Sequence, residues 1–292
     1  MSTRVWLEAA RPRTLSAAVA PVLVGTAAAE AFSAWRAGAA LVVALSVQVA
    51  VNYANDYFDG VRGVDTAERV GPRRAVATGL VAPARMRAAM LVALGVAGVA
   101  GLALAAVTTW WLLAVGAACI LATLGYSGGP RPYASAGLGE VFVFVFFGLV
   151  ATAGSAFVQD ERLSAVALLA GVPVGLAAVA ILVANNLRDV TTDARAGKRT
   201  LAVRLGEGQT RALYVVLVLG LFLLLPSLGV TQGSWWPLVG LGAAPLALPP
   251  VRAVLAGAVG PRLIPVLVGT ARLQVAFAVL LAAGLWAGGR AA

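Results

Sequence analysis

Nine long apolar runs are the feature that most constrains the fold of this 292-residue chain. An α-helix needs about 20 mainly apolar residues to cross the hydrocarbon core of a bilayer. The runs occupy residues 14–31, 37–57, 86–107, 109–126, 138–158, 163–187, 211–230, 235–254 and 263–287. Because alternating strand patterns are absent from the sequence, it predicts an all-α polytopic membrane protein with nine transmembrane helices. The polar stretches between the runs are short, so we expect one domain over residues 1–292.

The composition supports a membrane protein and excludes several classes of chemistry. Apolar residues make up 61% of the chain and charged residues 12%, against about 45–50% and 25% in soluble domains. The sequence contains no histidine, which excludes a Ser-His-Asp triad and a histidine-ligated metal. Its single cysteine, Cys119, excludes an intramolecular disulfide and an iron–sulfur site.

The basic residues are distributed very unevenly between the two sides of the predicted membrane. With nine spans, 18 of the 22 Lys and Arg residues fall on one side, and only Arg36, Arg162 and Arg290 fall on the other, with Arg272 inside the last span. This asymmetry predicts a cytoplasmic N-terminus, cytoplasmic polar loops and an outer C-terminus, in a bacterial cytoplasmic membrane. The net charge of +10 therefore indicates topology and attraction to anionic lipid, not nucleic-acid binding.

Two clusters of amides and carboxylates end apolar runs on the predicted cytoplasmic side. The first contains Asn52, Asn55, Asp56 and Asp59, and the second contains Asn185, Asn186, Asp189 and Asp193. Steps of three or four residues place most members of each cluster on one helical face. A polar stripe that enters a bilayer needs a cavity or a polar partner. We therefore expect the two stripes to face each other across the bundle.

The residue types in these clusters suit a metal–diphosphate complex. Mg²⁺ is usually held by one or two carboxylates together with water and phosphate oxygens. Basic residues follow each cluster: Arg73 after the first, and Lys198 and Arg199 after the second. Acids that hold a cation beside bases that hold phosphate oxygens predict such a site. The alternative is that Asp and Arg simply form ion pairs at polar helix ends. Two matching clusters on separate spans favour the metal–diphosphate site over this alternative.

Residues 6–15, 55–66 and 185–201 carry a resemblance to a known family. They resemble the UbiA superfamily of intramembrane prenyltransferases, and most closely its 1,4-dihydroxy-2-naphthoate polyprenyltransferase branch in menaquinone biosynthesis. The resemblance implies a helical bundle around a central cavity, Mg²⁺ dependence, a polyprenyl diphosphate donor and an aromatic acid acceptor. It also implies loss of CO₂ and diphosphate, giving a demethylmenaquinone. One departure is Gly63, where the superfamily pattern has a third Asp; the next acid here is Asp65.

From the residues and the resemblance together we assign roles to the candidate site residues. The expected metal-binding and catalytic residues are Asp56, Asp59, Asp189 and Asp193, with Asn55 as a further metal ligand and Lys198 in catalysis. The expected diphosphate contacts are Arg73, Arg131, Lys198 and Arg199. The expected supporting or substrate-contacting residues are Asn52, Asn55, Asn185, Asn186, Tyr57, Tyr126, Arg11 and Arg13.

The supporting residues also have simpler interpretations. Tyr57 and Tyr126 would stabilise positive charge through their ring faces, or lie in an interfacial aromatic belt. Arg11 and Arg13 would bind the acceptor carboxylate, or serve as cytoplasmic anchors. Glu140 is expected to form an ion pair with Arg131.

Two other functions stay open from the sequence alone. The first is a related enzyme with another acceptor, such as 4-hydroxybenzoate, homogentisate or a haem, which would use the same donor site. The second is an ion-coupled transporter. A transporter predicts acidic residues through the depth of the bilayer, whereas the acids here gather at one side.

Overall fold

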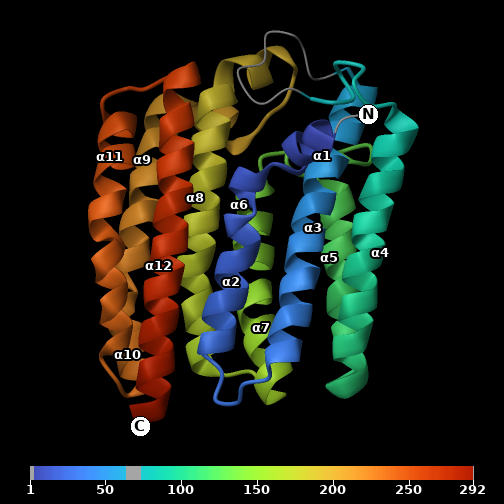
Figure 1. The fold of residues 1–292 in the computed structure, drawn as a ribbon. Coiled ribbons are helices and arrows are strands. Elements are labelled where there is room, and N and C mark those ends of the chain that lie inside the picture. Colours follow the sequence, from blue (N-terminus) through green and yellow to red (C-terminus); the bar gives the residue numbers. More distant parts are fainter. Residues whose placement is uncertain (1–2, 64–73, 292) are drawn as a thin grey trace.

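The computed structural model describes residues 3–63 and 74–291, and every regular element in these ranges is helical (Figure 1). The first half of the chain forms α1 (Thr3–Ala10), η1 (Pro12–Thr14), α2 (Ser16–Ala27), α3 (Ala34–Val61), α4 (Pro83–Val107), α5 (Trp111–Ser127), α6 (Gly139–Val143), η2 (Phe144–Val150) and α7 (Ala151–Asp160). The second half forms α8 (Ala165–Arg195), α9 (Leu201–Leu223), α10 (Leu225–Gln232), η3 (Trp236–Ala243), α11 (Ala244–Leu255), η4 (Gly260–Leu263) and α12 (Ile264–Ala291). The predicted all-α class is confirmed.

Seven of the nine predicted spans are long and apolar enough to cross a membrane. They are Ala34–Val61, Pro83–Val107, Gly139–Asp160, Ala165–Arg195, Leu201–Gln232, Trp236–Leu255 and Gly260–Arg290. The predicted runs 14–31 and 109–126 correspond to α2 and α5, which are apolar helices of 12 and 17 residues. Helix length therefore supports seven spans in the part of the chain that the structure describes, and the count of nine stays a prediction.

Local sequence signals fix the start of the helices that surround the site. Pro83 is the first residue of α4, a position where the missing N–H of proline costs no hydrogen bond. The Ser164 hydroxyl accepts a hydrogen bond from the Ala167 N–H at 3.0 Å and caps α8. Thr200 caps α9 in the same way by accepting from the Val203 N–H at 3.4 Å. Such caps satisfy backbone donors that a helix leaves unpaired at its N-terminus.

The helices form two groups with a connecting layer between them (Figure 1). The largest apolar core lies among α8, α9, α10, η3, α11 and α12, with a contribution from α2. The second group is α3, α4 and α5, which pack against one another. The segment α6–η2–α7 packs against α8 and brings α7 to α2 and α3. The polar ends of α3 and α8 therefore belong to different groups and face the space between them.

The α6–η2–α7 segment approaches α8 closely through glycines. Its central part, η2, is a π-helix of 7 residues. A Cβ atom added at Gly148 would lie 2.6 Å from the Gly175 Cα and 2.9 Å from the Gly171 carbonyl oxygen. Small residues at such contacts let two membrane helices approach to backbone distance. The contact fixes the position of the aromatic residues that η2 carries.

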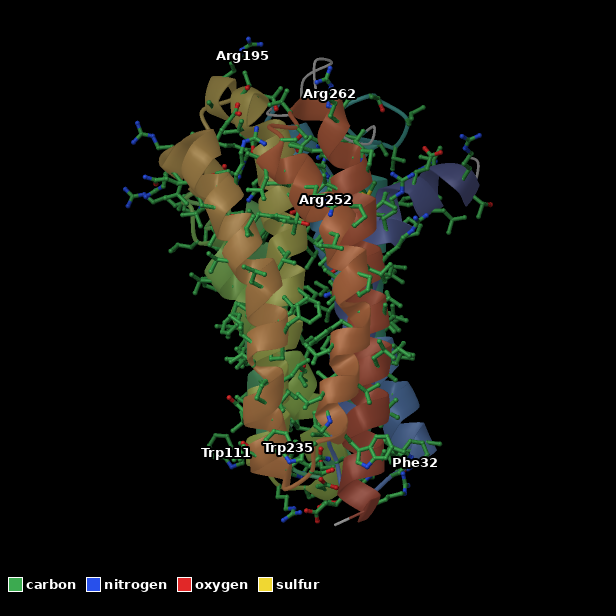
Figure 2. The ribbon with its side chains drawn as sticks, turned by 90° about the vertical axis from the view of Figure 1, so that its left-hand side faces the viewer. Phe32, Trp111, Arg195, Trp235, Arg252 and Arg262 are labelled. Atoms are coloured by element: carbon green, nitrogen blue, oxygen red, sulfur yellow. The ribbon has the colours of Figure 1, made fainter. Side chains whose placement is uncertain are left out.

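The two ends of the bundle differ in their exposed side chains. Figure 2 shows Arg195, Arg252 and Arg262 toward one end, and Phe32, Trp111 and Trp235 at the other. Further exposed tryptophans are Trp35, Trp110 and Trp236. Figure 1 places α1 at the end opposite the C-terminus, together with the connection that follows α8. Arginines at one end and amphipathic aromatic rings at the other are typical of a protein that spans a bilayer.

Candidate active site

Both polar clusters line a single cavity of about 1030 Å³. Its walls come from η1, from α2 to α8 and from α12. From the first cluster, Asn52, Asn55 and Asp59 line the cavity, and from the second, Asn185, Asn186, Asp189 and Asp193 do so, together with Lys198. The structure thus brings the ends of α3 and α8 to the same space, as the polar stripes predict.

Asp59 connects the first cluster to the segment after the second. Its buried carboxylate accepts a hydrogen bond from Lys198 Nζ at 3.0 Å, and Arg74 Nη2 lies 3.7 Å from the same oxygen. The Lys198 N–H donates to the Asp193 carbonyl at 2.9 Å, which turns the chain back toward the cavity. Gly197 makes this turn with φ of 76°, a conformation that glycine adopts without steric cost.

Asp189 is held by its neighbour on α8. The Arg188 guanidinium donates to both carboxylate oxygens of Asp189, at 2.7 and 2.6 Å, and to Asn185 Oδ1 at 2.9 Å. Both charged side chains are 4% exposed. Bidentate pairing of this kind is strong and directional, so Arg188 and Asp189 form a fixed polar unit in the cavity wall.

Amide side chains of α3 anchor the N-terminal segment to the rim of the cavity. Asn52 Nδ2 donates to the Ala10 carbonyl at 2.8 Å and to Thr14 Oγ1 at 3.0 Å, and Gln48 Nε2 donates to the same hydroxyl at 3.0 Å. The Ser127 hydroxyl donates to Asn55 Oδ1, which joins the end of α5 to α3. This network positions η1 and α5 around the end of α3.

Comparison with known proteins identifies the family. Residues 18–259 match the UbiA prenyltransferase family. The chain belongs to the UbiA prenyltransferase family. This confirms the resemblance seen in the three sequence stretches, and with its apolar helices the chain is an integral membrane protein.

Relatives of this UbiA-family chain extend the match over nearly its whole length. It is 48% identical over 283 residues to 1,4-dihydroxy-2-naphthoate octaprenyltransferase of Mycobacterium leprae, covering 96% of this chain and 95% of that one. It is 46% identical to the protein of the same name from Mycobacterium tuberculosis, covering 96% of each chain. Its fold is similar to that of a UbiA homolog from Archaeoglobus fulgidus bound to GPP and Mg²⁺, with a TM-score of 0.64, 15% identity and coverage of 95% and 99%.

Asp56 lies outside the residues that line the cavity of this UbiA-family chain, and its role as a metal ligand stays a prediction. Its carboxylate, on a residue 2% exposed, accepts hydrogen bonds from the Ala75 and Val76 N–H groups, both at 2.9 Å. Those amides belong to the turn that precedes α4. Both oxygens of Asp56 make this backbone contact, which fixes the turn against α3.

Replacing Asp56 by alanine is expected to lower stability by about 2 kcal/mol, because two buried N–H groups lose their acceptor. Asp56→Asn keeps one acceptor oxygen and is expected to lose less. Thermal unfolding of the purified protein in detergent, compared among the wild type and the two variants, measures the effect. Equal unfolding temperatures for the wild type and Asp56→Ala would contradict the structural role.

Other predicted site residues divide into those at the cavity and those away from it. Tyr126, Arg11 and Arg13 line the cavity. Tyr57 instead packs against the apolar cluster that holds Ala75 and Val76, and its role at the site stays a prediction. Outside the lining, Arg131 and Arg199 are exposed, and their contacts with a diphosphate stay a prediction. Arg73 and Asp65 lie outside the described residues.

The expected ion pair between Glu140 and Arg131 is wrong. Glu140 is buried and its Oε1 accepts a hydrogen bond from Asn186 Nδ2 at 2.9 Å, while Arg131 is exposed. Asn186, which was expected to support the site, therefore joins α8 to the start of α6. Its neighbour Asn185 is bonded to Arg188, so both amides of the pair have structural contacts at the cavity.

The sequence analysis missed several residues of the cavity wall. Arg188 and Arg74 contribute positive charge at the polar end. Farther along, Tyr133, Phe142 and Phe146 form an aromatic wall, with the first two rings stacked at 3.9 Å and the last two at 6.0 Å. Burial raises the pKa of Tyr133 above the usual range for tyrosine, so its protonated hydroxyl donates to the Ala122 carbonyl at 2.6 Å. The period of four between Phe142 and Phe146 was an available signal.

The oxygen atoms that could act as metal ligands at the polar end suit a hard divalent cation. Amide and carboxylate oxygens of Asn55, Asp59, Asp189 and Asp193 line the cavity, and oxygen ligands of this kind suit Mg²⁺. Within residues 3–63 and 74–291, no three acidic side chains form a ready metal-binding group. Buried carboxylates need a positive partner, and Lys198 and Arg188 supply it for Asp59 and Asp189.

Proposed function

We propose that the chain transfers a polyprenyl group from polyprenyl diphosphate to 1,4-dihydroxy-2-naphthoate, releasing diphosphate and CO₂ and giving demethylmenaquinone. The observation that carries this proposal is one cavity with a charged end and an apolar depth. The charged end suits a diphosphate, and the apolar depth suits a prenyl chain. Identity of 48% to an octaprenyltransferase for this acceptor, over nearly the whole chain, supports the choice of reaction.

Charge at the polar end accounts for activation of the donor. Lys198, Arg188 and Arg74 line this end beside the carboxylates and place positive charge close to a bound diphosphate. They stabilise the negative charge that develops on the diphosphate as its bond to the allylic carbon weakens. Bound Mg²⁺, held by Asp59, Asp189, Asp193 and Asn55, would supply Lewis-acid stabilisation of the same charge. The solved UbiA homolog bound to GPP and Mg²⁺ supports this pairing of ligand and metal.

The aromatic and apolar walls account for protection of the reacting fragment. An allylic group that loses diphosphate gains positive charge and must be kept from water. Tyr126 lines the cavity, and its ring face can stabilise that cation. Arg11 and Arg13, at the rim formed by η1, are positioned to bind the acceptor carboxylate.

We further propose that the charged end of the cavity faces the cytoplasm of a bacterial cell, in the cytoplasmic membrane. Arg195, Arg252 and Arg262 lie toward one end of the bundle, and the exposed Trp111 and Trp235 lie at the opposite end (Figure 2). An excess of arginine on cytoplasmic loops supports this orientation.

Product analysis with a panel of acceptors tests the reaction. The purified protein is incubated with Mg²⁺, octaprenyl diphosphate and either 1,4-dihydroxy-2-naphthoate, 4-hydroxybenzoate or homogentisate, and products are identified by mass spectrometry. We expect a prenylated, decarboxylated product from the naphthoate alone. Product from 4-hydroxybenzoate and none from the naphthoate would replace the acceptor assignment. Ion or solute flux in proteoliposomes without diphosphate release would contradict the assignment as an enzyme and indicate a transporter.

A further inference from the structure

Arg272 is a charged residue on the lipid-facing side of the last helix. On α12 the exposed residues include Pro265, Arg272, Val275, Val279 and Trp286. Spacings of seven, three, four and seven residues place all five on one helical face. Because the rest of this face is apolar and the chain is an integral membrane protein, the guanidinium lies on a surface that contacts lipid.

The position of Arg272 along α12 places it inside the hydrocarbon layer. Trp286 packs edge-on against Phe32, with ring centroids 5.6 Å apart, and Figure 2 shows Phe32 at the tryptophan-rich end of the bundle. Aromatic rings of this kind mark the membrane interface. Arg272 precedes Trp286 by 14 residues, which is about 21 Å along the helix. In a hydrocarbon core about 30 Å thick, its Cα atom is therefore closer to the opposite leaflet.

The chain supplies no counter-anion for Arg272 in the part that the structure describes, where its side chain has no ion pair or hydrogen bond. Residues 208–292 contain five arginines and no Asp or Glu. The last acidic residue of the chain, Glu207, already pairs with Arg211 at 2.9 Å. A cation at membrane depth is costly unless it reaches an anion or water, so the anion for Arg272 has to come from outside the chain.

The geometry of an α-helix determines which leaflet the side chain approaches. Cα–Cβ bonds are tilted toward the N-terminus of a helix, and long arginine side chains extend toward the nearer interface. The N-terminal turns of α12 lie at the charged end of the cavity, where Ile264 and Val268 line it together with Arg13 and Thr14 of η1. The Arg272 guanidinium is therefore directed toward the phosphate groups of the leaflet at that end.

We propose that Arg272 binds the phosphate of an anionic phospholipid from this leaflet, with the acyl chains along the exposed face of α12. Guanidinium and phosphate form strong, charge-assisted hydrogen bonds, often bidentate. Val275 and Val279, which are 45% and 50% exposed, continue this face toward the tryptophan-rich end. Helix α2 packs beside α12 (Figure 1) and adds the exposed Val19 and Leu23.

The charge of the surrounding segment favours an anionic lipid over a zwitterionic one. A zwitterionic headgroup carries its own ammonium group, which an arginine-containing segment without acids repels, whereas a net negative headgroup is attracted to it. The inference concerns the outer surface of the bundle and does not depend on the proposed reaction.

Lipid titration followed by native mass spectrometry tests this site. Purified full-length protein is titrated with phosphatidylglycerol or phosphatidylcholine that have the same acyl chains, and the dissociation constant of the first bound lipid is measured. We expect the wild type to prefer phosphatidylglycerol, and Arg272→Gln to lose about fivefold or more of that preference. The matched control is Arg87→Gln on α4, where the arginine is also exposed and has no partner in the described residues. This control is expected to keep the wild-type preference.

A measurement on the wild type alone keeps the proposal testable if a variant does not fold. Phosphatidylglycerol is expected to raise its unfolding temperature by about 2–4 °C more than phosphatidylcholine does, and equal shifts would overturn the proposal. An unchanged preference in Arg272→Gln, or an equal loss in Arg87→Gln, would also overturn it. Displacement of the lipid by inorganic phosphate at equal concentration would indicate a site for free phosphate instead. Loss of a dimer mass in Arg272→Gln without a change in lipid preference would make a second copy of the chain the partner.

Discussion

Replacing Asp59 by asparagine is expected to reduce prenyl transfer about 10²- to 10³-fold, the scale seen when one preorganised electrostatic contact to developing charge is lost. Asp59 is the carboxylate of the first cluster that lines the cavity, and it holds Lys198 at 3.0 Å. Asparagine keeps the shape and the acceptor oxygen but removes the charge. The variant therefore loses both the charge for a divalent ion and the position of the lysine.

The measurement is kcat with saturating donor and acceptor across a Mg²⁺ titration. The matched control is Asp160→Asn, at the opposite end of the bundle, where the carboxylate accepts hydrogen bonds from the Glu30 and Ala31 N–H groups. We expect near wild-type turnover from this control. Turnover of Asp59→Asn is measured at a temperature at which circular dichroism shows the variant to be folded, because loss of a buried carboxylate beside Lys198 and Arg74 also lowers stability. Near wild-type turnover of Asp59→Asn would contradict the role of Asp59.

Replacing Arg188 by methionine is expected to lower the free energy of unfolding by about 3–5 kcal/mol, because it leaves the Asp189 carboxylate buried without its cation. The pair is bidentate at 2.7 and 2.6 Å, and both side chains are 4% exposed. Breaking one side of such a pair is far more costly than replacing the whole pair by apolar residues of similar volume. Arg188 is thus expected to be essential for stability as well as for charge at the site.

The double variant Arg188→Met/Asp189→Leu separates the two contributions. It is expected to recover most of the lost stability and to have no detectable prenyl transfer, because both site charges are gone. Chemical unfolding in detergent and product formation measure the two quantities on the same preparations. A single variant as stable as the wild type would contradict the burial argument, and an active double variant would contradict the catalytic one.

The sequence predicts the fold class and the meeting of the two clusters because both depend on local patterns. Apolar length determines which segments can cross a bilayer, and seven predicted runs correspond to helices of sufficient length. The polar stripe on α3 places Asn52, Asn55 and Asp59 on one face, and all three line the cavity. Polar side chains on such a stripe are costly to expose to lipid. The stripe therefore faces the cavity, and its polar residues alone are enough to predict this.

The sequence could not predict which acidic residue turns away from the cavity. Asp56 is one residue from Asn55 and four from Asn52, so helical spacing gives it a position near the stripe. Its direction is decided by the Ala75 and Val76 N–H groups, about 20 positions later in the chain. Only tertiary structure brings those donors to α3. The pairing of Glu140 with Asn186 has the same origin.

The contact between the adjacent residues Arg188 and Asp189 on α8 could not be predicted from the sequence either. Neighbouring positions on a helix point in different directions, which argues against a contact between Arg188 and Asp189. The long arginine side chain nevertheless reaches back to the carboxylate of the next residue and to Asn185. Because the charged pair is enclosed by other helices, burial selects this geometry, and spacing rules for exposed helices do not apply to it.

The π-helical turns of η2 keep one row of side chains aligned along the cavity. Phe142, Phe146, Val150, Gly154 and Val158 all line the cavity, at regular steps of four residues. In an α-helix, four residues exceed one turn by about 40°, so such a row would wind away around the axis. The wider turns of η2 rotate the row in the opposite sense and cancel part of that winding. A single row of side chains can therefore stay in contact with a long, extended guest from its head to its tail.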